Sequence, residues 1–171
     1  MKQMFSLMAL LLVLSACKKD TIEYRNEYSK SYQSWIAFKA ASGNSYDYLV
    51  VSNSWTGYST ETLISVRSGV ITARHFVARI SKNDGTGQVT VVEEWLEGNA
   101  QVGTHQKGAN PQTLDEVYAM AKTTWLLKRE DAKTFFEATN NGMISSCGYV
   151  PNACADDCFT GITISSITAV Q

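Results

Sequence analysis

Between residues 46 and 96 apolar and polar residues alternate with a period of two, and this alternation constrains the fold more than any other feature. Such alternation is typical of strands with one buried face. The connections are short, and both Ser68-Gly69 and residues 83–87 have the composition of tight turns. Because connections of hairpin length join antiparallel strands, the sequence predicts an antiparallel meander with strands over residues 46–51, 60–67, 70–80 and 89–96.

Two segments have helical spacing instead. Residues 18–42 carry aromatic and apolar side chains that recur once per helical turn, namely Tyr24, Tyr28, Tyr32, Trp35 and Ile36. We expect this stripe to pack against a sheet. Asp20 is a plausible N-cap for this helix. A second helix begins at Thr113-Leu114-Asp115-Glu116, which has the form of a capping box, and ends near residues 128–131.

Three further strands are predicted over residues 133–139, 143–147 and 161–170. Phe135-Phe136 favours extended structure, and Asn140-Asn141-Gly142 is a hairpin signal. Continuation of the second helix to Asn141 is the competing interpretation. The sequence therefore predicts an α+β fold, in which two helix-plus-antiparallel-meander units form one curved antiparallel sheet with both helices on one face.

The chain begins with the pattern of an export signal. Lys2 supplies a positive charge, and the apolar run of residues 7–14 is too short for a bilayer core, which needs roughly 20 residues. Leu14-Ser15-Ala16-Cys17 follows and resembles the lipobox of bacterial lipoproteins. The resemblance implies that residues 1–16 are cleaved as a signal peptide, that Cys17 is lipidated, and that residues 17–171 form a single membrane-anchored domain. An ordinary signal peptide with an incidental cysteine is the alternative.

The residues after Cys17 indicate at which membrane the protein is expected. In lipoproteins an aspartate directly after the lipidated cysteine favours retention at the inner membrane, whereas Lys18 and Lys19 stand here. We therefore expect a protein of the cell envelope, at the outer rather than the inner membrane.

Three cysteines remain once Cys17 is assigned to lipid, so at most one disulfide forms within the chain. Cys147 and Cys158 flank the loop predicted over residues 148–159 and are the first choice for a pair, with Cys147 and Cys154 the second. The alternative is a metal-handling or thiol-redox protein, in which all three thiolates bind a soft ion such as Zn²⁺ or Cu(I). Their spacing matches no zinc-ribbon or Cys-x-x-Cys pattern, so no metal or cofactor is predicted.

Charge and motifs exclude some functions. The 15 Lys and Arg residues against 16 Asp and Glu give a net charge of −1, whereas a nucleic-acid-binding surface would need clustered positive charge. We interpret Arg67, Arg74 and Arg79 as part of a solvated, mixed-charge sheet face. Neither His75 nor His105 belongs to a His-Glu-x-x-His motif, and no Gly-x-Ser-x-Gly elbow is present. The sequence therefore favours a non-catalytic protein.

The loop between the first two predicted strands is the best candidate for a binding tip. Trp55 and Tyr58 lie in or beside it, and exposed aromatic side chains on a rigid scaffold favour contact with proteins or sugars. The alternative is that Trp55 folds back onto the edge of the sheet. Besides the membrane, the expected partners are an envelope protein or a glycan.

The whole chain after the signal resembles a family of small bacterial lipoproteins. The resemblance lies in the aromatic first helix with Trp35, the strand Ser45-Tyr46-Asp47-Tyr48, the Thr-Leu-Asp-Glu helix start, and the run from Asn141 to Pro151 with its following cysteines. The helix–meander order is similar to that of beta-lactamase-inhibitory protein and related secreted domains. It implies a secreted α+β domain of the cell envelope, and it transfers no functional residues. The lipobox, an antiparallel sheet with one solvated face and the absence of catalytic motifs together favour a non-catalytic binding or structural module of the envelope.

Overall fold

The computed structural model describes residues 22–82 and 87–170, and these residues form one seven-stranded sheet and two helices. The elements follow in chain order as α1 (Arg25–Ala41), β1 (Tyr46–Asn53), β2 (Tyr58–Arg67), β3 (Val70–Ser81), β4 (Val89–Gly98), the 3-10 turn η1 (Asn99–Gln101), α2 (Leu114–Met120), the π-helical turn η2 (Ala121–Trp125), β5 (Ala132–Glu137), β6 (Ser146–Pro151) and β7 (Thr160–Ala169). The predicted signal peptide, Asp20 and Cys17 lie outside the described residues.

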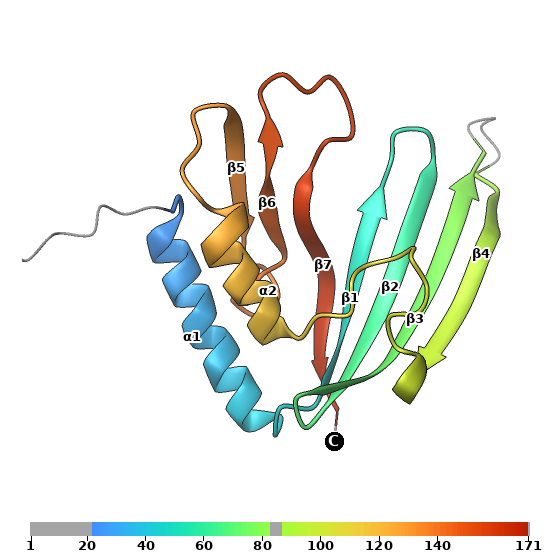
Figure 1. The fold of residues 1–171 in the computed structure, drawn as a ribbon, viewed down its shortest axis with the longest axis horizontal. Helices are drawn as coiled ribbons and strands as arrows, with labels where there is room; N and C mark the ends of the chain where they lie inside the picture. The colour runs from blue at the N-terminus through green and yellow to red at the C-terminus, as the bar shows by residue number, and fades with distance from the viewer. Residues whose placement is uncertain (1–21, 83–86, 171) are drawn as a thin grey trace, which may run out of the picture.

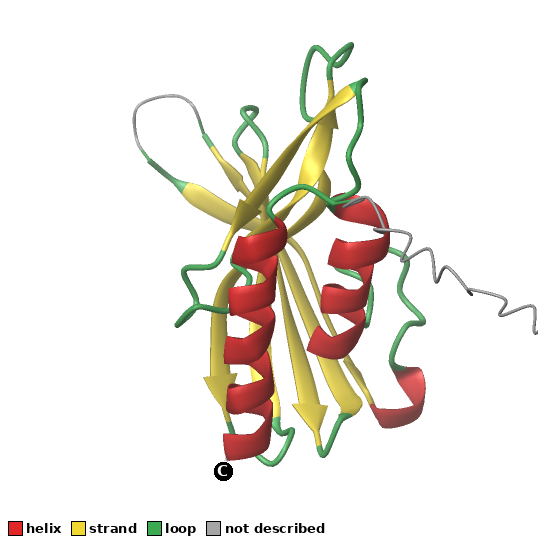
Figure 2. Cartoon of the chain, turned by 90° about the vertical axis from the view of Figure 1, so that its left-hand side faces the viewer, coloured by secondary structure: helices red, strands yellow, loops and turns green. Residues whose placement is uncertain are grey.

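The sheet has the order β4-β3-β2-β1-β7-β6-β5, and every neighbouring pair is antiparallel (Figure 1). Both helices lie on the same face of the sheet (Figure 2). The predicted α+β class and antiparallel sheet are confirmed. The strand expected over residues 133–139 is present as β5, so the second helix does not continue to Asn141.

The first helix begins later than its aromatic spacing predicts. Ile22 forms an antiparallel bridge with Leu127, and the Glu23 N–H donates to the Leu126 carbonyl at 2.7 Å. These bonds to a distant segment keep residues 22–23 out of the helix, which starts at Arg25 after Tyr24 in the left-handed region with φ 54°. None of the helices in the described part of the chain is long and apolar enough to cross a membrane.

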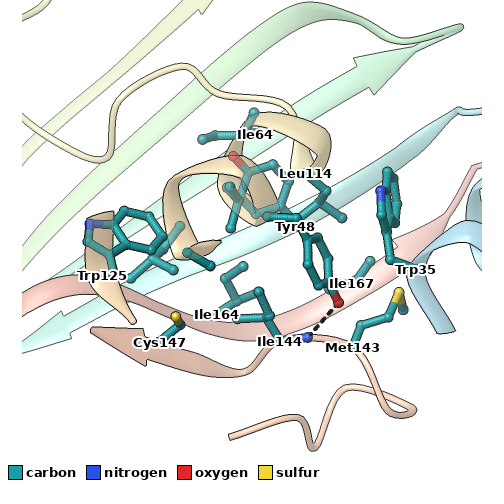
Figure 3. Packing of buried hydrophobic residues seen from close by; sticks show 14 of the residues in the cluster. Trp35, Tyr48, Ile64, Leu114, Trp125, Met143, Ile144, Cys147, Ile164 and Ile167 are labelled. Atoms are coloured by element: carbon teal, nitrogen blue, oxygen red, sulfur yellow. Dashed lines mark hydrogen bonds between the residues drawn. The ribbon is translucent and has the colours of Figure 1, made fainter. Parts of the chain in front are cut away.

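The core lies between the helices and the inner face of the sheet (Figure 3). Trp35 of α1 is fully buried, and its indole ring packs edge-on against Tyr46 of β1 and stacks on Tyr118 of α2. Its Nε1–H donates to Asp115 Oδ1 at 2.9 Å, so this large side chain leaves no buried polar group unsatisfied. Trp35 and the partly buried Tyr28 therefore pack on the core, as the sequence predicts, whereas Tyr24, Tyr32 and Ile36 of the same stripe are exposed.

The second helix starts with the capping box that the sequence predicts. The Glu116 N–H donates to Thr113 Oγ1 at 3.3 Å, and the Thr113 N–H donates to Glu116 Oε2 at 2.7 Å. The helical segment ends at Trp125, a few residues before the predicted end. Arg129 donates side-chain hydrogen bonds to the carbonyls of Thr124 and Leu127, which satisfies backbone acceptors at this end.

Candidate functional site

The sheet opens between β1 and β7. Their ladder runs from Tyr46 opposite Ala169 to Val50 opposite Ile164, with a register shift beside Val50. Beyond this point β1 continues to Asn53, while β7 starts at Thr160 and pairs only with β6. Figure 1 shows the two strands diverging toward the end that carries the β1–β2 and β6–β7 loops.

A pocket of about 640 Å³ lies where the strands diverge. Its walls come from the ends of β1 and β7, the neighbouring part of β2, residues 108–112 and Trp125 of η2. None of its side chains carries a charge: they are Val50, Val51, Ser52, Asn53, Thr60, Thr62, Gly108, Ala109, Asn110, Gln112, Trp125, Phe159, Gly161, Ile162 and Thr163. Hydroxyl, amide and aromatic groups of this kind suit a neutral ligand that both hydrogen-bonds and offers apolar surface.

Residues 108–112 form one wall because they lie directly on the sheet. The Ala109 N–H donates to Thr62 Oγ1 at 3.0 Å, and the Tyr48 hydroxyl donates to the Gln112 carbonyl. Gly108 has φ 82°, and a Cβ at this position would lie 2.9 Å from the Phe76 ring and 3.0 Å from Thr62 Oγ1. Only glycine therefore allows the wall to lie this close to β2 and β3.

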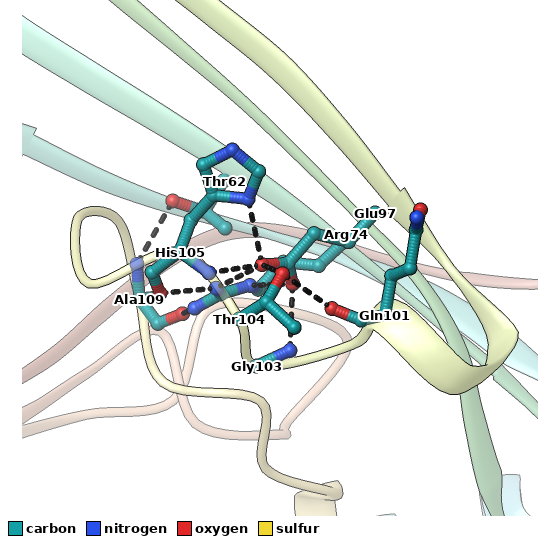
Figure 4. A network of polar contacts seen from close by, with 8 residues as sticks. All are labelled: Thr62, Arg74, Glu97, Gln101, Gly103, Thr104, His105 and Ala109. Atoms are coloured by element: carbon teal, nitrogen blue, oxygen red, sulfur yellow. Dashed lines mark hydrogen bonds and ion pairs between the residues drawn. The ribbon is translucent and has the colours of Figure 1, made fainter.

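A buried ion pair anchors this wall (Figure 4). Arg74 of β3 and Glu97 of β4 lie opposite each other in the ladder, and their side chains are 2% and 1% exposed. Arg74 donates to both carboxylate oxygens at 2.9 Å. It also donates to the carbonyls of Ala109 at 2.9 Å and His105 at 2.7 Å. The pair therefore holds the segment that leads into the pocket wall.

The Glu97 carboxylate completes the anchor by accepting hydrogen bonds from the same loop. Its donors are the backbone N–H of Gly103 at 2.7 Å, the Thr104 hydroxyl at 3.2 Å, and the N–H and Nδ1 of His105 at 2.5 and 2.9 Å. The Arg74 guanidinium, followed by these donors, holds the pKa of Glu97 well below its usual range despite burial. The carboxylate is therefore charged at neutral pH.

This network corrects one expectation from the sequence. Arg74 is buried and does not belong to a solvated face; Arg67 and Arg79 are partly exposed and pair with Asp47 and Glu61. Strand alternation places Arg74 on the face of the sheet that the helices cover. The buried Glu97 opposite it supplies the negative charge that compensates the buried guanidinium.

The β1–β2 loop forms one rim of the pocket. The Ser54 N–H donates to the Tyr58 carbonyl at 2.8 Å and the Ser81 N–H to the Gly57 carbonyl at 2.9 Å, so the turn is tied to β3. Trp55 is 71% exposed and Tyr58 is 37% exposed. Trp55 therefore projects into solvent from a constrained turn, and the alternative in which it packs on the sheet edge is not what the structure shows.

The β6–β7 loop forms the facing rim and carries the disulfide. Cys154 pairs with Cys158, with their Cα atoms 6.2 Å apart, and Cys147 is a buried free thiol. Both predicted pairings of Cys147 are therefore wrong. The reason is the length of β6, which runs to Pro151 instead of ending at residue 147, so Cys147 lies inside the sheet and only Cys154 and Cys158 share the loop.

A hydrogen bond joins the two rims. Ser54 Oγ donates to Asp157 Oδ2 at 2.7 Å, and Asp157 lies within the disulfide-closed ring with φ 48°. The structure thus gathers three sequence candidates, Trp55, Cys154 and Cys158, at one end of the molecule beside the pocket. Sequence reasoning missed the pocket itself, because its walls come from five separate segments and no local motif marks them.

The other candidate chemistries are not assembled in the described part of the chain. No group of three His, Cys, Asp or Glu side chains able to hold a metal ion occurs there. His75 contacts Glu94 at 2.9 Å and His105 contacts Glu97 at 2.9 Å. The side-chain hydrogen bonds of these residues join neither imidazole to a hydroxyl or a thiol, as a nucleophile would require.

The cysteine arrangement gives a direct prediction. Burial raises the pKa of the Cys147 thiol to about 12, and the side chain is fully buried, so alkylation of the native protein should not label it. Among the cysteines of residues 22–170, unfolding without reductant should expose Cys147 alone, and reduction should add Cys154 and Cys158. Peptide mass mapping after each step identifies the labelled residue. Labelling of Cys154 or Cys158 in the unfolded, unreduced chain would contradict the observed pairing.

Comparison of the chain with protein-family models, with curated proteins and with solved structures found no match.

Proposed function

We propose that this chain is a lipid-anchored cell-envelope protein that acts as a non-catalytic binding module and binds its partner at the pocket end. The observation that carries the proposal is the uncharged pocket of about 640 Å³ beside the exposed Trp55. A concave site next to a rigid, exposed aromatic side chain is the arrangement that binding hot spots favour. The partner class is an envelope protein or a glycan.

The lipobox supports the anchoring part of the proposal. Lipid on Cys17 would attach the domain to a membrane, with Lys18 and Lys19 favouring the outer one. Ile22 is already bridged to Leu127, so four residues separate the lipid from the fold. A fully extended link from Cys17 to Ile22 reaches at most about 18 Å. The domain is therefore proposed to lie close to its membrane.

We infer that α1 with β1–β4 and α2 with β5–β7 correspond to two helix-plus-meander units, similar to those of beta-lactamase-inhibitory protein. The order of the elements along the chain agrees with this correspondence. It favours a secreted domain that binds through its surface.

The alternative role in metal handling or thiol redox chemistry needs three thiolates at one place. Cys147 faces the core, whereas Cys154 and Cys158 are bonded to each other in an exposed loop. This arrangement gives the alternative no support. A non-catalytic role is preferred, since the pocket lining holds no side chain that carries charge or titrates near neutral pH.

Replacement of Trp55 by alanine tests the proposal. The W55A variant should bind envelope fractions at least tenfold more weakly than the wild type, because a hot-spot tryptophan contributes about 2 kcal/mol or more. The measurement is a binding titration against isolated cell-wall glycan and, separately, against detergent-solubilised envelope membranes.

The matched control is L96A, which removes another large exposed side chain. Leu96 is 69% exposed on β4, a strand that contributes nothing to the pocket lining. It should bind like the wild type. If neither fraction binds the wild type above background, or if W55A and L96A weaken binding equally, the proposed binding function is wrong.

A further inference from the structure

The free end of β1 directs backbone groups into the pocket. Residues of an antiparallel strand send their N–H and C=O groups alternately to the two neighbouring strands. The Ser54 N–H donates to the Tyr58 carbonyl of β2, which fixes the even-numbered residues of β1 as those that face β2. Val51 and Asn53 therefore face the β7 side, and both line the pocket.

The free end of β7 also directs backbone groups into the pocket, from the opposite wall. The Ile164 N–H donates to the Ser145 carbonyl at 2.7 Å, which fixes the even-numbered residues of this part of β7 as those that face β6. Gly161 and Thr163 therefore face β1, and both line the pocket. The β1–β7 ladder ends at Val50 and Ile164, so among the described residues Asn53 and Gly161 have no ladder partner across the gap.

We propose that the pocket binds a short, extended, uncharged peptide segment, which adds as a strand between β1 and β7. This inference rests on the proposed binding function and names its ligand class. Residues that face the same neighbour recur every second position, about 6.6–6.8 Å apart, which is the repeat of an extended peptide backbone. Main-chain pairing of this kind supplies affinity wherever a strand adds to an open sheet edge.

The lining favours a peptide over a glycan and sets the character of that peptide. A glycan would rely on side-chain groups, whereas two facing backbone edges match the alternating donors and acceptors of another polypeptide. The uncharged walls would leave the charge of an Asp, Glu, Lys or Arg side chain unpaired. The Ser54–Asp157 bond closes the open end of the gap. The inserted segment is therefore about as long as residues 51–53 and 160–163.

Hydrogen exchange of the full-length protein tests the proposal. The probe is a mixture of acetylated, amidated tetrapeptides randomised over Ser, Thr, Ala, Val, Asn and Gln. At saturation, exchange of the Asn53, Gly161 and Thr163 amides should slow at least tenfold, while amides of β4 remain unchanged. The same mixture with N-methylated backbones keeps the side chains and cannot pair, so it should give no protection.

Two pairs of variants separate backbone pairing from side-chain recognition. N53P removes a backbone donor at an edge position that accepts proline, and it should weaken peptide binding at least tenfold. N53A keeps that donor and loses only the side-chain amide, so it should weaken peptide binding less than N53P does. T163P and T163A repeat the comparison on β7, so the test survives if one proline variant does not fold.

Several results would overturn the inference. They are equal protection by the N-methylated mixture, an equal loss in N53A and N53P, or protection by N,N′-diacetylchitobiose where the peptides give none. If W55A still loses envelope binding while no peptide protects these amides, the proposed binding function stands and only the peptide assignment fails.

Discussion

Replacement of Arg74 by methionine should lower the free energy of unfolding by about 3–5 kcal/mol, because it leaves the Glu97 carboxylate buried without its counter-ion. Both side chains are nearly inaccessible, at 2% and 1% exposed, so water cannot replace the guanidinium. The variant also loses the hydrogen bonds to the His105 and Ala109 carbonyls. Urea denaturation at pH 7 measures the loss.

Two controls separate the ion pair from a general effect of lost arginine. R67M breaks the partly exposed pair with Asp47 and should cost no more than about 1 kcal/mol. The double variant R74M/E97L leaves no unpaired buried charge and should recover part of the loss. The remainder reflects the backbone groups of Gly103, His105 and Ala109 that lose their hydrogen-bond partners. A loss below about 1 kcal/mol in R74M would show that the anchor does not stabilise the fold.

The free energy of unfolding of wild type and R74M should depend differently on pH. The pKa of Glu97 is lower in the folded protein than in the unfolded chain, so ionised Glu97 stabilises the wild-type fold fully above the unfolded-chain pKa of about 4.3. This stabilisation is lost as the pH falls below that value. In R74M the carboxylate lacks its counter-ion, and protonation removes this unpaired buried charge. Acid therefore reduces the destabilisation that the substitution causes. The difference in stability between wild type and R74M should therefore be largest near neutral pH and shrink in acid.

Replacement of Cys17 by serine should abolish membrane attachment. Acyl chains contribute about 0.8 kcal/mol per buried CH₂, and more than one chain gives stable anchoring, so loss of the acceptor thiol should move nearly all of the protein to the soluble fraction. Membrane fractionation measures the shift. Mass spectrometry of the wild type should show a chain that begins at Cys17 with added acyl mass.

C158S is the matched control, since it removes a different thiol by the same substitution. It breaks the Cys154–Cys158 disulfide in an exposed loop and should leave the protein in the membrane fraction. Retention of C17S in the membrane fraction, or an unmodified Cys17 in the wild type, would refute lipid anchoring.

Local sequence patterns predict most of the secondary structure because the causes are local. The alternation of β1 to β4 and the capping box at Thr113 depend on neighbouring residues, and both are confirmed. The start of α1 depends on the bridge between Ile22 and Leu127, which are far apart in sequence. The extent of β6 depends on pairing with β5 along its whole length. Patterns within one segment carry no signal for either.

The candidate site was predicted only in part, for the same reason. The exposure of Trp55 follows from a short polar turn, which is a local property. Arg74 and Glu97 are 23 residues apart and look like ordinary charged strand residues until the register places them opposite each other. The pocket depends on where the β1–β7 ladder ends, and no pattern within either strand marks that point.

The junction of β1 with β7 also has a consequence for folding kinetics. Every other pair of neighbouring strands is consecutive in the chain, whereas this ladder joins residues 46–50 to residues 164–169. Closing so long a loop carries a large entropic cost, and such non-local pairings slow folding. We expect the two local meanders to form first and this junction last. A chain arrested before that step would have all seven strands and no pocket, so competence to bind would arise only with the final folding event.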